Sequence, residues 1–200
     1  MTKIKICGIT DIEDARAAAE LGADALGFIF AVSPRRITAE RAREIIRELP
    51  PFVTSVGVFV GQTPAEVNEI ARYAGLNAVQ LHGSEPAGHA AAIEYPIIKR
   101  IAVAEGDTIA DIQARAGGFP APAYLLDPGQ GRGLTFDWRV ARGFRGTLIL
   151  AGGLIPENVA SAIGLARPYG VDASSGLESK PGRKDRIKMK KFIEEVRSCG

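Results

Sequence analysis

The chain has 200 residues, of which 46% are hydrophobic and 24% are charged, and its formal net charge is +2. This composition excludes an intrinsically disordered chain, and the length is sufficient for one domain with a substantial core. A net charge so close to zero excludes a strong overall field, so we expect neither nucleic acid nor a membrane surface as a partner.

Cysteine usage and the N-terminal residues predict the compartment in which the protein works. Cys7 and Cys199 lie at opposite ends of the chain without metal-ligand spacing, which argues against a disulfide framework and favours a reducing compartment. The N-terminus lacks the apolar core of a secretory signal, and no apolar run is long enough to cross a bilayer. We therefore expect a cytoplasmic protein.

Runs of apolar and β-branched residues alternate along the chain with apolar stripes at helical spacing. The runs predict eight strands, at residues 3–6, 25–30, 54–60, 78–83, 96–103, 123–127, 147–150 and 170–173. The stripes predict the helices that follow them, at residues 10–21, 42–49, 63–74, 85–94, 107–112, 137–138, 156–166 and 189–196.

Several of these helices carry signals at their ends. Thr10-Asp-Ile-Glu13 and Thr63-Pro-Ala-Glu66 have the spacing of a capping box, which predicts a helix start at each threonine. Asp107 is placed to cap the weaker helix that follows it, and Gly22 predicts the end of the first helix.

Strict alternation of strands and helices predicts a parallel sheet. Eight such units of about 25 residues each favour a closed (β/α)8 barrel, the TIM barrel of the α/β class. An open doubly wound sheet is the alternative, but it normally has a glycine-rich turn after its first strand and fewer units. Because no Pro/Gly-rich linker divides the chain, residues 1–200 are expected to form a single (β/α)8 barrel domain.

The carboxyl ends of the strands of a parallel barrel meet at one mouth, where catalytic residues collect. In this chain polar or small residues follow the apolar strands at these ends, which indicates that the positions serve function. They are Cys7, Arg35, Arg36, His82, Asp127, Gly152, Gly153, Asp172, Ser174, Ser175 and Gly176.

Two of the rim loops predict a phosphate site. Gly152 and Gly153 follow the seventh strand, and Ser174, Ser175 and Gly176 follow the eighth, where phosphate is commonly bound in this architecture. Small residues let backbone N–H groups approach a phosphate, and a helix N-terminus adds a favourable partial charge. The alternative is that these residues only form turns.

The other rim residues each allow two interpretations. Cys7 is either a small buried hydrophobe or a reactive group, and Asp127 is either a loop cap or a proton donor made a weaker acid by burial. Arg36 either offers its planar fork to a carboxylate or is a solvated loop charge, and Arg35 beside it is expected to be a solvated loop charge. His82 is either a satisfied histidine at a strand end or a catalytic group.

The sequence predicts no metal ion and no organic cofactor. Neither His82 nor His89 has a nucleophilic partner implied by spacing, and there is no cluster of metal ligands. A P-loop is absent, and residues 129–133 lack the strand–loop–helix context of a dinucleotide fingerprint. The basic run at residues 183–191 alternates with the apolar stripe of the last helix and predicts a solvated face.

Seven short motifs occur in order along nearly the whole chain: Lys5–Thr10, Gly57–Val60, Val79–Gly83, Leu126-Asp127, Thr135–Trp138, Gly152–Val159 and Val171–Glu178. Together they resemble the phosphoribosylanthranilate isomerase family of tryptophan biosynthesis. The resemblance implies a (β/α)8 barrel without cofactor. It also implies an Amadori rearrangement of N-(5′-phosphoribosyl)anthranilate to 1-(2-carboxyphenylamino)-1-deoxyribulose 5-phosphate.

By matched motif, the resemblance implies that Cys7 is the general base and Asp127 the general acid. It assigns Arg36 to the anthranilate carboxylate, Asp172 to the ribose hydroxyls, and the backbone of the two small-residue loops to the phosphate. The residues predicted to bind substrate are Arg36, His82, Asp172, Gly152, Gly153, Ser174, Ser175 and Gly176. The chain departs from the family at residues 129–135, Gly-Gln-Gly-Arg-Gly-Leu-Thr, where members usually have a Gly-Gly-(Ser/Thr)-Gly run.

One acid and one base suffice for this chemistry. A proton delivered to the ring oxygen opens the furanose to a Schiff base, and removal of the C2′ proton gives an enolamine that becomes the ketone. A free thiol with a pKa of about 8.5 is only a few per cent ionised at neutral pH. We therefore predict that positive potential in the site favours the Cys7 thiolate.

Other functions remain open from the residues alone. A barrel like indole-3-glycerol-phosphate synthase would need a catalytic lysine at the rim, but Lys99 lies inside the fifth strand. The histidine-pathway sugar isomerase uses two aspartates, and Cys7 replaces the first. A phosphate-binding barrel without turnover is the third alternative, and the oligomeric state, monomer or homodimer, is open.

Overall fold

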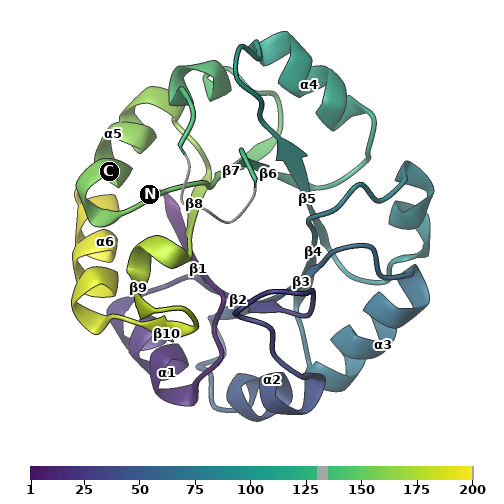
Figure 1. The fold of residues 1–200 in the computed structure, drawn as a ribbon, viewed down its shortest axis with the longest axis vertical. Helices are drawn as coiled ribbons and strands as arrows, with labels where there is room; N and C mark the ends of the chain where they lie inside the picture. The colour runs from purple at the N-terminus through teal and green to yellow at the C-terminus, as the bar shows by residue number, and fades with distance from the viewer. Residues whose placement is uncertain (130–134, 200) are drawn as a thin grey trace.

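The computed structural model describes residues 1–129 and 135–199, which form a closed barrel of eight parallel strands (Figure 1). Neighbouring strands pair in chain order, and the last strand pairs back onto the first, so the predicted barrel is confirmed and the open sheet is excluded. The strands are β1 (Lys3–Cys7), β2 (Ala25–Ile29), β3 (Thr54–Phe59), β4 (Ala78–Leu81), β5 (Ile97–Ala102), β6 (Ala123–Asp127), β7 (Thr147–Leu150) and β8 (Gly170–Ala173).

Helices surround the barrel as an outer ring (Figure 1). The α-helices are α1 (Ile12–Leu21), α2 (Ala39–Ile46), α3 (Pro64–Ala74), α4 (Ile109–Gly117), α5 (Pro156–Ala166) and α6 (Arg186–Ser198). Within the described residues, no helix is both long enough and apolar enough to span a membrane.

Two of the predicted helices form only short 3-10 turns, η1 (Ala87–Ala92) and η2 (Trp138–Ala141). η1 buries none of its side chains, so packing does not stabilise a longer helix there. A third turn, η3 (Ser175–Leu177), leads into an antiparallel hairpin of β9 (Glu178–Lys180) and β10 (Arg183–Lys184). This hairpin was not predicted from the sequence.

Helix capping agrees with the sequence at one start and differs at two. The capping box at Thr63 is present before α3. The cap of α1 is Asp11 and not Thr10, because the Thr10 hydroxyl donates to a carbonyl of the β9–β10 turn at 2.6 Å. Thr108 caps α4 in place of Asp107, whose carboxylate accepts from a backbone N–H of its own loop.

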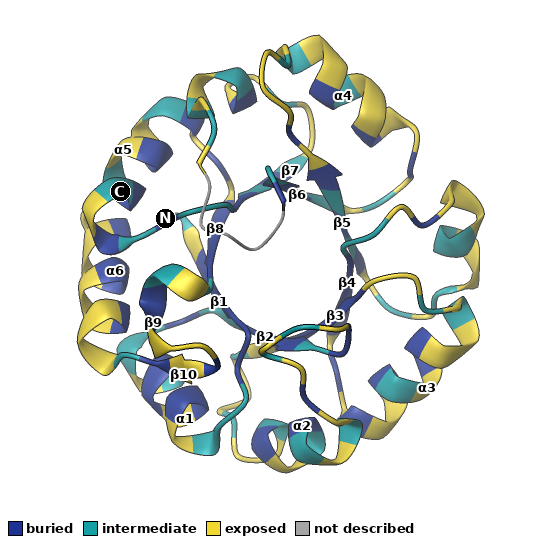
Figure 2. Cartoon of the chain, in the orientation of Figure 1, coloured by how far each residue is buried: buried dark blue, intermediate teal, exposed yellow. Residues whose placement is uncertain are grey.

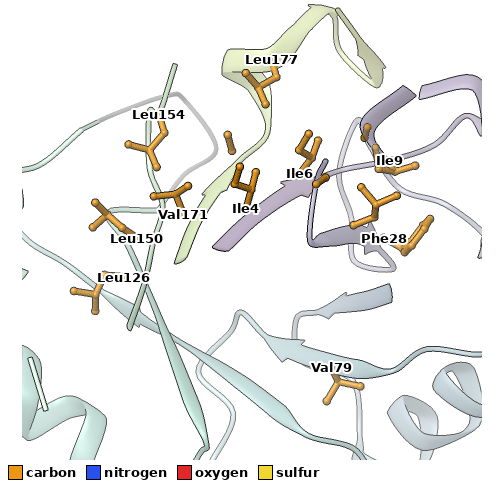
Figure 3. Close-up of a cluster of buried hydrophobic side chains, with 14 of the residues drawn as sticks. Ile4, Ile6, Ile9, Phe28, Val79, Leu126, Leu150, Leu154, Val171 and Leu177 are labelled. Atoms are coloured by element: carbon orange, nitrogen blue, oxygen red, sulfur yellow. The ribbon is translucent and has the colours of Figure 1, made fainter. Parts of the chain in front are cut away.

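The main hydrophobic core lies between the strands and the helices (Figure 2). Figure 3 shows Ile4 and Ile6 of β1 in this layer, with Phe28 and Val171 from the two neighbouring strands. Burial of each such side chain contributes roughly 1.5–3 kcal/mol to folding. Because side chains alternate along a strand, Lys5 and Cys7 face the opposite way, into the barrel.

Candidate active site

A cavity of about 550 Å³ opens at the carboxyl ends of the strands. It collects residues from β1, β2, β3, β4, β6 and β8 and from the loops that follow β2, β3, β4, β6, β7 and β8. Of the ten residues predicted for the site, nine line it: Cys7, His82, Asp127, Gly152, Gly153, Asp172, Ser174, Ser175 and Gly176. The tenth, Arg36, has an exposed side chain and does not line the cavity.

Cys7 is the last residue of β1, and its side chain is buried at the cavity wall. Its neighbour across the sheet is Gly27 of β2. A Cβ atom at Gly27 would lie 2.6 Å from the Cys7 sulfur, so the absence of a side chain gives the sulfur its room. A thiol held at a strand end on a polar cavity is placed for chemistry and not only for packing.

The electrostatic surroundings of Cys7 differ from the sequence prediction. Burial raises the pKa of the Cys7 thiol, and it outweighs the lowering by the nearby Lys5 and Lys184 ammonium groups. The Asp172 carboxylate raises this pKa further. The positive groups thus favour the thiolate, but desolvation of the sulfur is the larger effect, so the net shift of the Cys7 pKa is upward and opposite to the expected one.

Asp172 lines the cavity as one half of a buried ion pair. Its Oδ1 accepts a hydrogen bond from Lys5 Nζ at 2.9 Å, and the two side chains are only 9% and 5% exposed. Burial raises the pKa of Asp172, while the Lys5 ammonium opposes this shift. The carboxylate is thus fixed at the strand end, with its Oδ2 atom outside this bond.

Asp127 ends β6, and His82 lies beside it just beyond β4. Asp127 Oδ1 accepts from the backbone N–H of Gly129 at 2.7 Å, and its Oδ2 lies 3.7 Å from His82 Nε2. Burial lowers the pKa of His82 to about 4, so the imidazole is neutral near pH 7. Gln80 Nε2 donates to His82 Nδ1 at 3.0 Å, which leaves the ring hydrogen on Nε2, facing Asp127.

The two small-residue loops pack against each other as one cradle. Gly152 and Gly153 both have positive φ, at 87° and 60°, which favours glycine. Gly176 has no room for a Cβ atom, because the Leu154 carbonyl oxygen occupies that space. The Ser174 hydroxyl donates to the Cys7 carbonyl at 3.0 Å, which ties the cradle to the end of β1.

The prediction that Arg35 is a solvated loop charge is wrong. Instead of a solvated loop charge it is a cavity-lining side chain, bonded through Nε and Nη2 to the two Glu178 oxygens at 2.7 and 2.8 Å. Lys184 Nζ also donates to Glu178, at 3.0 Å, and is buried. The basic C-terminal run is therefore not wholly a solvated face. Arg35 and Lys184 hold the pKa of Glu178 below its usual range, against the effect of burial.

Apolar side chains line the β2–β3 side of the cavity. Ile29 ends β2 and Val58 lies in β3, while Val32 and Val60 stand on the loops that follow these strands. In the strand order of the barrel, this wall is across the mouth from the glycine cradle. The cavity therefore has a cradle of main-chain groups at one side and a hydrophobic surface at the other.

Two further sequence predictions bear on the site. Residues 130–134, which include most of the glycine-rich stretch after Asp127, lie outside the described residues. Elsewhere in the chain no three His, Cys, Asp or Glu side chains cluster as a metal site requires. Lys99 does not line the cavity; its Nζ donates to the Gly83 carbonyl and pairs with Glu85.

The barrel and its mouth define a class: a (β/α)8-barrel enzyme whose site combines ionisable groups with a main-chain cradle suited to phosphate. A family model described as N-(5′-phosphoribosyl)anthranilate (PRA) isomerase matches residues 4–195. The chain belongs to this family, so the resemblance seen in the sequence is confirmed.

Individual relatives agree along the whole length. The chain is 48% identical over 208 residues to the N-(5′-phosphoribosyl)anthranilate isomerase of Trichlorobacter lovleyi, with 100% of both chains covered. A crystal structure of monomers generated from the dimeric isomerase of Thermotoga maritima is 43% identical, with a TM-score of 0.87 over 99% of this chain and 100% of that one. A solved isomerase in complex with reduced 1-(o-carboxyphenylamino)-1-deoxyribulose 5-phosphate is 44% identical, with a TM-score of 0.88 and the same coverage.

Proposed function

We propose that Cys7 and Asp127 carry out the isomerase reaction of this family in tryptophan biosynthesis by general acid–base catalysis. The reaction is the Amadori rearrangement of N-(5′-phosphoribosyl)anthranilate to 1-(2-carboxyphenylamino)-1-deoxyribulose 5-phosphate. The observation that carries the proposal is that the thiol and the carboxyl group line one cavity, from β1 and β6, beside the glycine cradle.

In the first step Asp127 gives a proton to the ring oxygen of the ribose. The bond between this oxygen and C1′ breaks, and the anilino nitrogen lone pair forms a C1′=N double bond. In the second step the Cys7 sulfur takes the proton from C2′, and the C–H electron pair forms a C1′=C2′ double bond while the nitrogen regains its lone pair. The resulting enolamine loses its enol proton and gains one at C1′, which gives the ketone.

The two sides of the cavity suggest how the substrate lies. The phosphate would bind backbone N–H groups at Gly152–Gly153 and Ser174–Gly176, and Asp172 would accept from the ribose hydroxyls. The anthranilate ring would then reach the apolar wall across the mouth. Arg36 stands on the loop beside this wall, so a rotation of its exposed side chain is needed to bring its guanidinium to the anthranilate carboxylate. Between the cradle and the apolar wall, the N–H group at His82 Nε2 would donate a hydrogen bond to the substrate.

Because burial raises the pKa of Cys7, the thiolate fraction of the free enzyme increases with pH through the alkaline range. We therefore expect kcat/KM to rise with pH on a limb whose apparent pKa lies above the ordinary thiol range. The rate of iodoacetamide modification should rise with pH in the same way. It is measured on the Cys199→Ser variant, in which Cys7 is the remaining thiol. A Cys7 midpoint below that of an unperturbed thiol would contradict this expectation.

The decisive test is the loss of substrate fluorescence as phosphoribosylanthranilate is consumed by the purified protein. Turnover in the wild type that disappears in the Cys7→Ser variant supports both the reaction and the role of the thiol. Binding of the substrate without turnover in the wild type would favour a phosphate-binding barrel instead.

We also propose that residues 1–200 act as one domain in a cytoplasmic homodimer. The free thiols of Cys7 and Cys199 support a reducing compartment. At the amino ends of the strands, a second cavity of about 240 Å³ lies beside Phe52, which is 95% exposed, and Tyr169, which is also exposed. An aromatic side chain next to a cavity on the same face is suited to a two-fold contact between copies. The related Thermotoga maritima enzyme is described as dimeric.

Replacing the exposed aromatic side chain tests the dimer. Phe52→Asp should shift the protein towards monomer in sedimentation experiments, because a charge would be buried at the contact. Val32→Asp adds the same charge at an exposed valine on the other mouth and should leave the sedimentation coefficient unchanged. Equal sedimentation of Phe52→Asp and wild type across a dilution series would argue against this face.

A further inference from the structure

Lys5 is a buried lysine inside the barrel, next to the site but outside the roles assigned so far. It precedes Cys7 by two residues on β1, so the pleat sends both side chains to the same face of the strand. Its Nζ donates to Asp172 Oδ1 at 2.9 Å, and Lys5 and Asp172 are also paired in the register that closes β1 onto β8. The Lys5 ammonium and the Cys7 thiol are close enough to influence each other: the ammonium lowers the pKa of the thiol, and the thiolate raises the pKa of the lysine.

A lysine in this position is costly for the fold. An ammonium group loses its hydration on burial, and a buried ion pair often contributes no more stability than an apolar pair of the same volume. Stability alone therefore does not account for a lysine that is bonded to a buried carboxylate and shares a strand face with a buried thiol. Its place beside two residues of the site points to a chemical role.

We propose that Lys5 is the positioning residue that enables Cys7 to act as a base. Its ammonium, fixed by Asp172 on the same strand face as the sulfur, stabilises the thiolate that burial disfavours. This inference rests on the proposed role of Cys7. During proton transfer the thiolate forms an S–H bond with the C2′ hydrogen, and the C–H electron pair moves into the C1′=C2′ bond. Lys5 keeps its own proton throughout, and its charge passes from pairing with the thiolate to pairing with Asp172 alone.

Charged groups face the Cys7 sulfur from several elements: Lys5 on β1, Asp172 on β8, Lys184 on β10 and Arg35 on the loop after β2. Lys184 and Arg35 are both bonded to Glu178, and Lys184 also donates to the Ser174 carbonyl at 3.1 Å. Lys5 differs because its ammonium is held inside the barrel by Asp172, on the same strand face as the sulfur, and it lowers the pKa of the thiol more than the other cations do. It is therefore the cation whose removal should affect the thiol most.

The test is the pH dependence of Cys7 alkylation by iodoacetamide in a Cys199→Ser background. In Lys5→Met the charge is lost while the length of the side chain is kept. We expect the alkylation midpoint to rise by about one pH unit or more, which is a tenfold lower thiolate fraction at a given pH. The kcat for phosphoribosylanthranilate should fall at least as far, with a smaller change in KM. Lys5→Arg keeps the charge and should hold the midpoint near the wild-type value.

Lys3→Met is the matched control. Lys3 lies on the same strand and pairs with Asp24 at the same distance of 2.9 Å, but its side chain is exposed. It should leave the Cys7 midpoint unchanged. If Lys5→Met does not fold, Lys5→Met/Asp172→Asn removes both buried charges, and its midpoint should still lie above that of the wild type.

Two outcomes separate this inference from the proposed function. A folded Lys5→Met protein, or the folded double variant, whose alkylation midpoint equals that of Lys3→Met would overturn the inference. Full turnover in Cys7→Ser would instead remove Cys7 as the base, whatever the alkylation profiles show. Alkylation needs no substrate. Failure of the Lys5 inference is therefore seen in the alkylation experiment, and failure of the proposed role of Cys7 is seen in the turnover assay.

Discussion

Cys7→Ser should lower kcat by about two orders of magnitude or more while substrate binding changes little. Serine is nearly the same size as cysteine and keeps the backbone of β1 and the contact with Gly27. Its hydroxyl is a far weaker acid than a thiol, so the oxyanion needed to take the C2′ proton is not formed at accessible pH. The thiol is thus lost as a base without a change in the shape of the cavity.

Steady-state rates from the fluorescence decrease, together with KM, give the measurement. Cys199→Ser makes the same atomic change at an exposed residue outside the site, and it should retain wild-type kcat. If Cys7→Ser turned over like Cys199→Ser, another group would have to remove the C2′ proton, and Cys7 would return to the role of a packing residue.

Asp127→Asn should have an effect of similar size, about 100-fold or more on kcat. The amide is isosteric with the carboxyl group, and its oxygen still accepts from the Gly129 N–H. It has no acidic proton to give to the ring oxygen, so opening of the furanose loses its acid. His82 does not substitute for it, because burial keeps the imidazole neutral.

The same assay on Asp137→Asn controls for removal of a negative charge outside the cavity. Asp137 is exposed, pairs with Arg139 and does not line the cavity, so kcat should stay near the wild-type value. Turnover by Asp127→Asn at the level of Asp137→Asn would exclude Asp127 as the acid.

The barrel was predictable from the sequence because each of its strands and helices is encoded by a local pattern of apolar residues. Apolar runs such as residues 25–30 alternate with helical stripes, and eight such units have few ways to bury both faces of every strand. The same regularity predicted most of the site. Cys7, Asp127 and Asp172 each end a strand, and parallel strands in a closed barrel bring their ends together.

The features that were not predicted from the sequence depend on contacts between distant residues and on burial. Arg35 and Glu178 are 143 residues apart, so nothing beside Arg35 in the chain shows that its charge is paired. The direction of the Cys7 pKa shift follows from how deeply the sulfur is buried, which residue type does not give. Lys5 could have been found, since the alternation along β1 places it on the same face as Cys7.

The ring closes by pairing β8 with β1, and that seam joins the two ends of the chain. The proposed base and its lysine stand on one side of the seam, and Asp172 and half of the phosphate cradle stand on the other. A folding intermediate whose first six or seven units are already formed therefore still lacks an assembled active centre. Catalysis in such a chain begins only when the final strand docks, so regained turnover during refolding reports completion of the ring and not the appearance of helices.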